Sequence, residues 1–371
     1  MAGTEPRPQR LEDVPGLVAP PVGQAPATRV LLRLPNWLGD IVMAAPAVEA
    51  ITRALPGARV TAQCIAPFVP LARLLPGVHE AVAAGPDRGP LSLWSSRRAL
   101  RAAGHDLAVV FPRGVRASLA PWLARVPVRV GFGDAGKRLL LTHGLRGWRP
   151  LRRAHRSLFY GALAGCFGTT PAGPWALQAP GAALAAADAL LERLGADRTL
   201  PLVVLEPGAR YGPAKCWPPE RFGALARLLM AEGCSVATVG TAATQPVEDD
   251  VARASGGGLV RTAGRTDDLL ALVGLLARAR LVVANDTGPM HLAAALGTPV
   301  LALFGATDPE VSAPRGPGPI RLVMQPAACS PCFLRTCTVA GHPCMRDIQV
   351  ERVLSEARAM LAQGPRAPAP G

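Results

Sequence analysis

Residues 281–304, LVVANDTGPMHLAAALGTPVLALF, contain the pattern that decides the fold class. Leu281–Ala284 and Val300–Phe304 are apolar runs typical of buried strands, and Pro289–Leu296 has the spacing of a short helix that Gly297 would end. A strand, a helix and a second strand in this order are typical of a βαβ unit, whose two strands run parallel. The stretch therefore predicts an α/β protein.

The same alternation continues through most of the 371 residues. The expected strands are Arg29–Leu34, Arg59–Ala66, Asp106–Phe111 and Val128–Phe132 in a first series, and Leu202–Glu206, Cys234–Val239, Leu281–Ala284 and Val300–Phe304 in a second. The expected helices are Ile41–Leu55, Ser92–Ala103, Gly114–Ala124 and His155–Phe167, then Gly181–Gly195, Pro219–Glu232, Thr244–Ala254, Asp267–Ala277 and Pro289–Leu296.

The stretch GTTPAGPWALQAP, residues 168–180, has the composition of a linker between the two series. We therefore expect two Rossmann-like domains, at 29–172 and 181–350, that face each other across a cleft. A flexible Pro-rich tail is expected at 1–28, and a C-terminal helix with a Pro-rich tail at 351–371.

The composition excludes several classes of protein. Apolar residues make up 49% of the chain, too many for a wholly disordered protein. Arg, Gly or Pro interrupts the apolar stretches before they reach about 18 residues, the length that a membrane span needs. Residues 1–30 lack the continuous apolar core of a signal peptide. We therefore expect a cytoplasmic protein whose eight cysteines are thiols.

Basic residues are concentrated in the first half of the chain. Of the formal net charge of +14, residues 1–178 carry +13, with 22 Arg and Lys against nine Asp and Glu. A genome that favours Arg would explain why 38 of the 40 basic residues are Arg, but not why acidic residues are scarce in one half only. The asymmetry predicts an anionic partner, and nucleic acid, anionic lipid and a phosphorylated glycan all fit.

The turn after Leu281–Ala284 is the strongest candidate for a ligand site. It places Asp286, Thr287 and Gly288 at the start of a helix, with His291 one turn further on. Backbone N–H groups at a helix N-terminus bind phosphate, and His291 would reach the same anion. An ordinary capped turn with a core histidine is the alternative, but it does not explain why these four residue types occur together.

Two other turns that follow expected strands carry charged residues. The loop in LEPGARYGPAKCWPPERF, residues 205–222, holds Lys215, one of two lysines in the chain. Lys215 either pairs with a diphosphate or is an ordinary solvated lysine. Asp40 follows Gly39 at the turn after the first expected strand, where it serves either as an N-cap or as a general base.

Three segments resemble the motifs of glycosyltransferase family 9 in order and spacing: LPNWLGDIVMAAPAVEAI, PGARYGPAKCWPPERF and NDTGPMHLAAALGTPVLALFGATDP. The tail CSPCFLRTCTVAGHPCMRDI is similar to that of the ADP-heptose:lipopolysaccharide heptosyltransferases, in particular the heptosyltransferase II branch. The resemblance covers about residues 29–350 and implies a GT-B fold. It also implies an inverting transfer of heptose from ADP-heptose to the inner-core heptose of a lipid A-linked lipopolysaccharide.

The resemblance implies roles for individual residues. Asp40 matches the general base proposed for the family, and Lys215 matches the loop lysine that meets the donor phosphates. Lys215 and the helix N-terminus at Gly288 would stabilise the leaving ADP, so no metal or other cofactor is required. The donor-binding set is Gly39, Gly208, Lys215, Asp286, Thr287, Gly288 and His291, and Gln245 and Glu248 are further candidates for the ribose.

The acceptor side departs from the family pattern. In FPRGVRASL, residues 111–119, Arg113 and Gly114 stand where the family usually has Asn and Ser. The basic residues expected to meet the acidic acceptor are Arg97, Arg98, Arg101, Arg113 and Arg116, together with Lys137, Arg138 and the basic stretch 146–156. The same surface would rest peripherally on the anionic cytoplasmic face of the inner membrane.

The cysteines Cys329, Cys332, Cys337 and Cys344 are clustered in the sequence. Their spacing would allow a tetrahedral zinc site, but zinc ribbons usually have two C-x2-C pairs and only one is present. A reduced thiol cluster without metal is therefore the favoured interpretation.

Other classes of protein explain less of the sequence. A nucleic-acid-binding protein would account for the basic half, but the chain has no motif of that class and only 4% aromatic residues for stacking on bases. A nucleotide-sugar epimerase of similar architecture needs no lipid-linked acceptor, so the basic half would be unexplained. Within the family, transfer of another sugar or transfer to another core position remains open.

Overall fold

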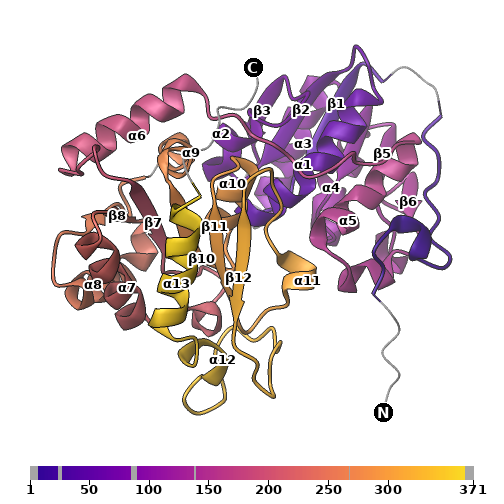
Figure 1. Cartoon of the computed structure of the whole chain (residues 1–371). Helices are drawn as coiled ribbons and strands as arrows, with labels where there is room; N and C mark the ends of the chain where they lie inside the picture. Colours follow the sequence, from indigo (N-terminus) through magenta and orange to yellow (C-terminus); the bar gives the residue numbers. More distant parts are fainter. Residues whose placement is uncertain (1–6, 24–26, 85–89, 138, 267, 364–371) are drawn as a thin grey trace. The chain divides into compact units, whose positions relative to one another are not determined.

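The computed structural model describes residues 7–23, 27–84, 90–137, 139–266 and 268–363. The chain divides into two compact units, Met1–Trp175 and Ala176–Gly371, each with one parallel six-stranded sheet (Figure 1). The division falls within the expected linker at 168–180. The expectations for Arg138, Asp267 and the chain ends at 1–6 and 364–371 lie outside the described residues.

Unit 1 holds the first series of strands. The strands are β1 (Arg29–Arg33), β2 (Arg59–Cys64), β3 (Glu80–Ala83), β4 (Leu107–Val110), β5 (Val128–Phe132) and β6 (His143–Leu145), in the order β3-β2-β1-β4-β5-β6. The α-helices are α1 (Leu38–Arg53), α2 (Val69–Ala72), α3 (Pro90–Ala103), α4 (Val115–Leu123) and α5 (Arg156–Gly161). Short 3-10 turns are η1 (Leu11–Asp13), η2 (Ala66–Phe68), η3 (Ala135–Lys137), η4 (Arg149–Arg153) and η5 (Ala162–Phe167).

Unit 2 repeats this topology. Its strands are β7 (Leu202–Glu206), β8 (Ser235–Thr238), β9 (Val260–Arg261), β10 (Leu281–Asn285), β11 (Val300–Phe304) and β12 (Ile320–Met324), in the order β12-β11-β10-β7-β8-β9. Its α-helices are α6 (Gly181–Arg193), α7 (Pro219–Ala231), α8 (Gln245–Ser255), α9 (Leu269–Arg278), α10 (Gly288–Ala295), α11 (Pro309–Ser312), α12 (Pro343–Arg346) and α13 (Val350–Leu361), with 3-10 turns η6 (Pro213–Lys215) and η7 (Ala242–Thr244).

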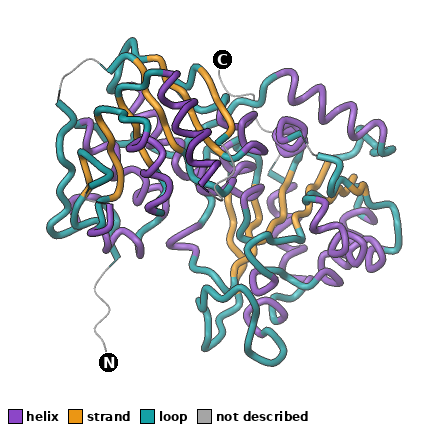
Figure 2. Tube along the Cα trace, turned by 180° about the vertical axis from the view of Figure 1, so that it is seen from behind, coloured by secondary structure: helices purple, strands orange, loops and turns teal. Residues whose placement is uncertain are grey.

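The strand order changes direction at one point in each sheet, between β1 and β4 in unit 1 and between β7 and β10 in unit 2. All strand pairs are parallel, so the carboxyl ends of these strands meet at one edge. Figure 2 shows the strands of each unit between helices. In such sheets ligands bind beyond the carboxyl ends where the order reverses, which directs attention to the turns after these four strands.

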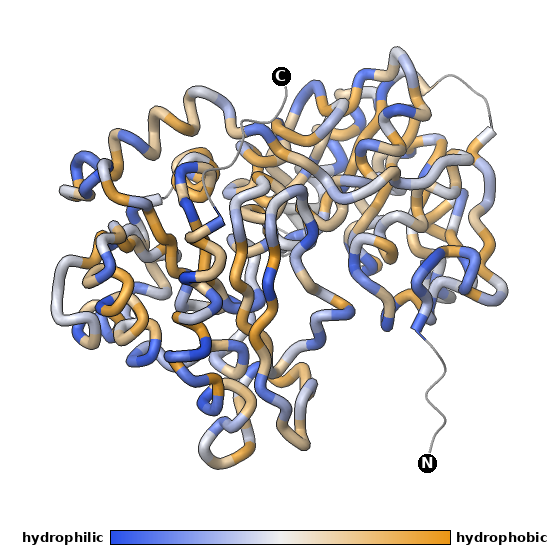
Figure 3. Tube along the Cα trace, viewed as in Figure 1, coloured by the Kyte–Doolittle hydropathy of each residue, from blue (hydrophilic) through white to orange (hydrophobic). Residues whose placement is uncertain are grey.

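The central strands are apolar on both faces because helices cover both faces. Val203, Val204 and Leu205 of β7 are fully buried, as are Leu31 and Leu32 of β1. The hydrophobic colouring follows these strands in Figure 3. Doubly covered parallel strands are continuous apolar runs rather than alternating ones, which explains why the sequence identifies them so clearly.

The short strands at the sheet edges differ from the expectations. No strand was expected at β3, β6, β9 or β12, each of which has two to five residues. Residues in these strands are only partly buried, for example in β12, where a single residue of five is buried. An edge strand lacks the continuous apolar run, and neighbouring strands rather than local sequence determine its pairing.

The segment expected to be a flexible N-terminal tail is in contact with unit 1 over residues 7–23. Val18 exchanges backbone hydrogen bonds with Arg146, at 3.0 and 2.9 Å, and the Val22 N–H donates to the Cys166 carbonyl at 2.8 Å. Val14 is 4% exposed. The Pro-rich composition predicted a flexible tail, but apolar residues such as Val14 and backbone hydrogen bonds attach this extended segment to unit 1.

Candidate active site

The turn between β10 and α10 lies at the carboxyl edge of the unit 2 sheet. Thr287 is the N-cap of α10 in extended conformation, yet its side chain makes no capping hydrogen bond. Its hydroxyl instead donates to Glu206 Oε2 at 2.8 Å. The first N–H groups of α10 are therefore not satisfied by the Thr287 side chain, and they form the positive end of the helix dipole.

Lys215 reaches this turn from a loop 71 residues earlier in the sequence. Its Nζ lies 2.9 Å from Asp286 Oδ2 and donates to the Asp286 carbonyl at 3.2 Å. The ring of Tyr211 lies 5.0 Å from the ammonium. The structure thus brings together two of the three turns that the sequence analysis selected, and the interpretation of Lys215 as a solvated surface lysine is wrong.

Asn285 links the end of β10 to the loop that follows β7. Its amide donates to the carbonyls of Glu206 and Pro207, at 3.3 and 3.0 Å, and its Oδ1 accepts from the Trp217 N–H at 3.0 Å. Ser312 Oγ adds a hydrogen bond to Asp286 Oδ2 at 3.1 Å. No role was expected for Asn285, although the available signal was a polar residue at the end of an apolar strand.

Glu206 is a buried acid that the sequence analysis did not select. It ends β7, is 5% exposed, and burial raises its pKa to about 8, against the smaller lowering effects of Thr287 and Lys215. The carboxyl group is therefore mostly protonated at pH 7. The sequence did carry a signal for this residue, because Glu206 is a charged residue at the end of an otherwise apolar strand.

His291 is also neutral at pH 7. It is 4% exposed, and burial lowers its pKa to about 4 despite the charge of Asp286. Its Nε2 lies 3.8 Å from Asp286 Oδ1. His291 can therefore orient Asp286 or offer a neutral N–H, but it does not add a positive charge for an anion.

Gly208 and the two ribose candidates, Gln245 and Glu248, have different surroundings in unit 2. A Cβ on Gly208 would lie 2.8 Å from Thr244, so this loop has no room for a side chain. Glu248 is 3% exposed and accepts hydrogen bonds from the Thr238 hydroxyl and the Ala263 N–H, while Gln245 donates to the Ala263 carbonyl at 3.3 Å. Because the Glu248 carboxylate is buried and occupied, the structure does not support it as a ribose ligand, whereas Gln245 is exposed and stays a prediction.

Asp40 lies in unit 1, at the carboxyl end of β1. The N-cap of α1 is Trp37, and Asp40 is the third residue of the helix, so its interpretation as an N-cap is wrong. Gly39 beside it is buried in the same turn. Asp40 is half-buried and forms a hydrogen bond with the hydroxyl of Tyr160, which lies on α5.

Tyr160 is a further residue that the sequence analysis did not identify. It is 8% exposed, and its ring packs 5.2 Å from Phe159 and 6.1 Å from Phe111. Burial, and then the carboxylate of Asp40, raises the pKa of Tyr160 well above its ordinary value. The hydroxyl therefore stays protonated and donates to Asp40.

Cationic groups gather at the carboxyl ends of β4 and β5. Burial, and then the charges of Arg152 and Arg156, lowers the pKa of Arg113. Lys137 is 1% exposed, and its Nζ donates to the Phe132 carbonyl at 3.2 Å. Burial lowers its pKa, against the raising effect of Asp134 and with a smaller lowering effect of Arg113. We call Arg113, Lys137, Arg152 and Arg156 the unit 1 cation cluster.

The other acceptor candidates lie on different elements from this cluster. Arg97, Arg98 and Arg101 are on α3, and Arg116 is on α4. The guanidinium of Arg97 lies 4.6 Å from the Trp94 ring, and its Nε donates to the Leu123 carbonyl at 3.3 Å. The expected basic residues thus lie on α3 and α4 as well as in the unit 1 cation cluster.

The clustered cysteines of unit 2 do not form a metal site in the structure. Among the residues that the structure describes, no three His, Cys, Asp or Glu side chains are placed to hold a metal ion. Cys344 is buried, and burial raises its pKa to about 11, with smaller contributions from Cys329, Cys337 and Cys332. The thiols are thus neighbours without the geometry of a ligand set.

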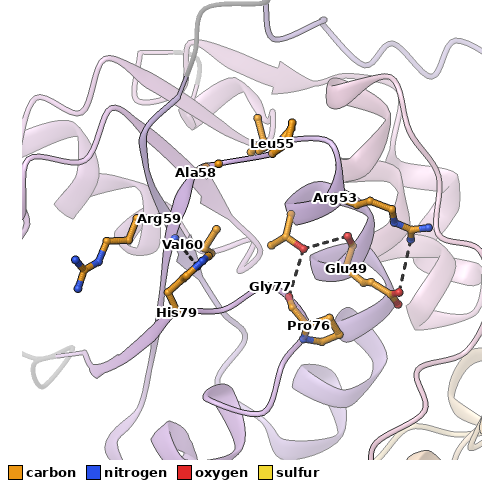
Figure 4. A pocket seen from close by; sticks show the side chains of 12 residues that line it. Glu49, Arg53, Leu55, Ala58, Arg59, Val60, Pro76, Gly77 and His79 are labelled. Atoms are coloured by element: carbon orange, nitrogen blue, oxygen red, sulfur yellow. Dashed lines mark hydrogen bonds and ion pairs between the residues drawn. The ribbon is translucent and has the colours of Figure 1, made fainter. Parts of the chain in front are cut away.

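A pocket of about 700 Å³ in unit 1 lies away from the candidate residues, where α1 ends and β2 begins (Figure 4). Its polar side chains already have partners within the protein. Thr52 Oγ1 donates to the Glu49 and Pro76 carbonyls, and His79 Nδ1 accepts from the Val60 N–H at 3.2 Å. The amino edge of a parallel sheet is also the edge that ligands do not use, so we assign no function to this pocket.

No helix within the described ranges has the length and apolar character required to cross a bilayer.

Comparisons with known proteins give consistent results. The sequence model of glycosyltransferase family 9 (heptosyltransferase) matches residues 93–342. Lipooligosaccharide heptosyltransferase 2 of Haemophilus ducreyi is 27% identical over 353 residues, which span 90% of this chain and 99% of the relative. The structure of ADP-heptose lipopolysaccharide heptosyltransferase II of Escherichia coli has a TM-score of 0.73 at 26% identity, covering 91% of this chain and 99% of that chain. A family 9 glycosyl transferase of Veillonella parvula has a TM-score of 0.81 at 20% identity, covering 92% and 100%, a likeness of fold.

Proposed function

This chain belongs to glycosyltransferase family 9, the heptosyltransferases, and from this premise we propose that it transfers heptose from ADP-heptose to the inner-core heptose of a lipid-linked lipopolysaccharide. The reaction we propose is a single displacement that inverts the anomeric centre. One group from each unit takes part, Asp40 as general base and Lys215 as the cation that meets the leaving ADP. No metal ion is required in this proposal.

The contact between Lys215 and Asp286 is the observation that carries the donor assignment. It brings the ammonium to the N-terminus of α10, so two sources of positive potential lie together. Both would stabilise the charge that develops on ADP as the glycosidic bond breaks. Asp286 balances Lys215 in the chain without ligand, and a bound diphosphate would compete with Asp286 for the ammonium.

The neutral states of Glu206 and His291 support the same assignment. A second ionised carboxylate beside Asp286 would repel a diphosphate, and burial removes that charge by keeping Glu206 protonated. The site then presents one carboxylate, one ammonium and the N–H groups of α10. This balance favours a polyanionic ligand over a neutral one.

The base assignment rests on the position and environment of Asp40. It lies where the strand order of unit 1 reverses, and a phenol hydroxyl orients its carboxylate. A carboxylate held in this way can accept the proton of an acceptor hydroxyl as that hydroxyl attacks the anomeric carbon. The transfer forms one glycosidic bond, breaks the bond to ADP and moves one proton to Asp40.

The unit 1 cation cluster supports an anionic acceptor. Arg152 and Arg156 lie close enough to Arg113 to lower its pKa, so the folded chain keeps like charges together at a cost in stability. An acceptor with phosphate or carboxylate groups would relieve this repulsion, and Arg binds both groups with two hydrogen bonds. We therefore propose this cluster as the acceptor's anion site, with the enzyme acting at the cytoplasmic face of the inner membrane.

The test is transfer from ADP-heptose to a heptose-deficient core acceptor by the full-length chain. We expect a product with inverted anomeric configuration by NMR and no effect of EDTA. Lys215→Ala and Asp40→Asn should each lower kcat by about a hundredfold or more, because each removes a group that acts in the transition state. The exposed Arg227→Ala and Asp250→Asn changes serve as matched controls and should leave kcat unchanged.

Different failures would reject different parts of the proposal. Full activity of Lys215→Ala would reject the donor site, and full activity of Asp40→Asn would reject the base. Conversion of the donor to an epimer without acceptor would favour the epimerase interpretation. Binding of ADP-heptose without transfer to the core would reject the acceptor.

A further inference from the structure

The outer face of α3 exposes an aromatic and basic stripe. Trp94, Arg98 and Arg101 are spaced four and three residues apart, which puts them on one side of the helix, and all three are exposed. Leu100, on the other side, packs into a core cluster with Leu31 of β1 and Ala108 of β4. The helix therefore has an apolar face toward the sheet and a tryptophan-containing basic face away from it.

The neighbouring helix α4 extends this surface. Trp122 is 42% exposed and Trp94 is 64% exposed, whereas Trp148, Trp175 and Trp217 are buried. Arg97 links the two helices, because its guanidinium lies over the Trp94 ring and its Nε donates to the Leu123 carbonyl. We call Trp94, Arg97, Arg98, Arg101 and Trp122 the α3–α4 face.

The charge of this region has no acidic counterpart nearby in the sequence. Residues 90–126 contain six Arg and one acid, Asp106, which accepts hydrogen bonds from Thr28 and the Arg29 N–H. Several exposed arginines on unit 2 helices differ, because they pair with acids, as Arg253 does with Asp250 at 2.9 Å and Arg358 does with Glu232. The α3–α4 face therefore attracts an external polyanion.

The tryptophans identify the kind of polyanion. A soluble phosphate compound would use the arginines alone and leave two large apolar rings in water. The headgroup layer of a bilayer accommodates both features, because indole rings favour the interface and basic side chains pair with anionic lipid phosphates. A surface with both features fits a lipid bilayer better than a nucleic acid, for which stacking requires rings arranged along a groove.

We propose that the α3–α4 face docks the enzyme on an anionic lipid bilayer, with Trp94 and Trp122 in the headgroup layer and Arg98 and Arg101 against lipid phosphates. The inference rests on the proposed function, in which the acceptor is attached to lipid. It assigns the basic residues of the first half to two tasks: the unit 1 cation cluster meets the acceptor, and the α3–α4 face meets the membrane.

The first experiment measures binding of the full chain to vesicles by co-sedimentation. We expect binding to phosphatidylcholine vesicles that contain phosphatidylglycerol, weak binding to pure phosphatidylcholine, and loss of binding at high salt, which screens the arginines. Trp94→Ser with Trp122→Ser should weaken binding about tenfold or more, because both rings lose their place in the interface. Trp37→Ser is the matched control, since Trp37 is as exposed as Trp122, at 42%, but lies outside α3 and α4.

Three results would overturn the proposal. The wild type could fail to bind anionic vesicles at low salt, or the double tryptophan variant could bind as tightly as the wild type. An oligonucleotide that binds with the same affinity and the same dependence on both tryptophans would show a different polyanion site. Self-association that the double variant abolishes would show an interface between copies of the chain.

A second experiment separates this proposal from the proposed function. The double tryptophan variant should transfer heptose at the wild-type rate to a water-soluble acceptor from which lipid A has been removed. On the same acceptor in vesicles it should lose about tenfold in kcat/KM, since it no longer concentrates at the surface. Equal activity on both acceptors would reject the docking face, whereas absence of transfer by the wild type would reject the function and leave the vesicle result intact.

Discussion

Single residues at the carboxyl edge of unit 2 show how burial adjusts charge. Glu206 and His291 are both ionisable and both buried, and burial moves their pKa values in opposite directions, to about 8 and about 4. Each is therefore neutral at pH 7, and for the same reason, since desolvation disfavours the charged form of both. The remaining charges are those of the Lys215–Asp286 pair, which the donor phosphates of the proposed reaction would meet.

The pKa of Glu206 predicts a pH dependence of stability. The unfolded chain releases this proton near the ordinary value of 4.5, whereas the folded chain holds it up to about 8. The folded state thus binds more protons between these values, and the free energy of unfolding falls as pH rises from about 4.5 to 8. Glu206→Gln mimics the neutral acid, so it should stabilise the chain at pH 8 by roughly a few kcal/mol and hardly at pH 4.5.

Thermal unfolding at the two pH values measures this difference. Glu220→Gln, an exposed site on α7, is the control and should show no such pH-dependent change. If Glu206→Gln stabilised the chain equally at pH 4.5 and pH 8, the raised pKa of Glu206 in the folded chain would be contradicted.

Tyr160→Phe tests how the proposed base is oriented. The change keeps the ring contacts with Phe111 and Phe159 but removes the hydroxyl that donates to Asp40. We expect kcat/KM to fall about tenfold, the typical worth of a hydrogen bond to a charged group. A carboxylate that loses a donor also binds protons more readily, so the acid limb of the pH–rate profile should move to higher pH.

The pH–rate profile distinguishes positioning from a structural role. A fall in activity with an unchanged acid limb and a lowered melting temperature would mean that Tyr160 acts only in packing.

The contact between α6 and α9 in unit 2 depends on a glycine, because no side chain fits between the two helices at that position. Gly274 of α9 lies so close to α6 that a Cβ would be 1.8 Å from the Ala183 carbonyl oxygen. The two helices can adopt this spacing only with glycine at this position. The sequence contains the glycine but does not show which element it faces.

Gly274→Ala should therefore destabilise the chain by about 1–3 kcal/mol or more, because α6 and α9 must move apart. Chemical denaturation of the variant measures this loss. Gly173→Ala is the control, since nothing lies within 4 Å of the added methyl group. Equal stability of the two variants would show that α6 and α9 can separate without cost.

Over the whole molecule, each unit has its own sheet and its own set of charged groups. Unit 2 holds the proposed donor site, and unit 1 holds Asp40 and the unit 1 cation cluster. The net charge of +13 in residues 1–178 belongs entirely to unit 1, because residues 176–178 are uncharged. The two proposed substrates should therefore affect the amides of different units.

Hydrogen exchange of the full chain tests this division. We expect ADP to slow exchange at amides 208–216 and 286–291 in unit 2, while amides near Arg113 and Lys137 in unit 1 keep their rates. The Lys215→Ala variant should lose this protection at the same ADP concentration. Protection confined to unit 1 would contradict the donor assignment.

The sequence by itself determined the α/β class, the two series of parallel strands and the turns that carry charge. Local sequence patterns identify the central strands and the helices, because apolar runs, Pro and Gly act on the adjacent backbone. It also indicated Lys215 and Asp286 individually. Local sequence did not predict the four edge strands, because their pairing depends on neighbouring strands that are distant in the sequence.

Only the tertiary structure decided which groups meet and which are charged. The pairing of Lys215 with Asp286 and of Tyr160 with Asp40 depends on loops and helices far apart in the chain. Burial, which no local pattern reveals, makes Glu206 a neutral acid and occupies Glu248 within unit 2. Ionisation and hydrogen bonding depend on desolvation and on partners brought together by folding, so a site's chemistry follows from the fold rather than from the order of its residues.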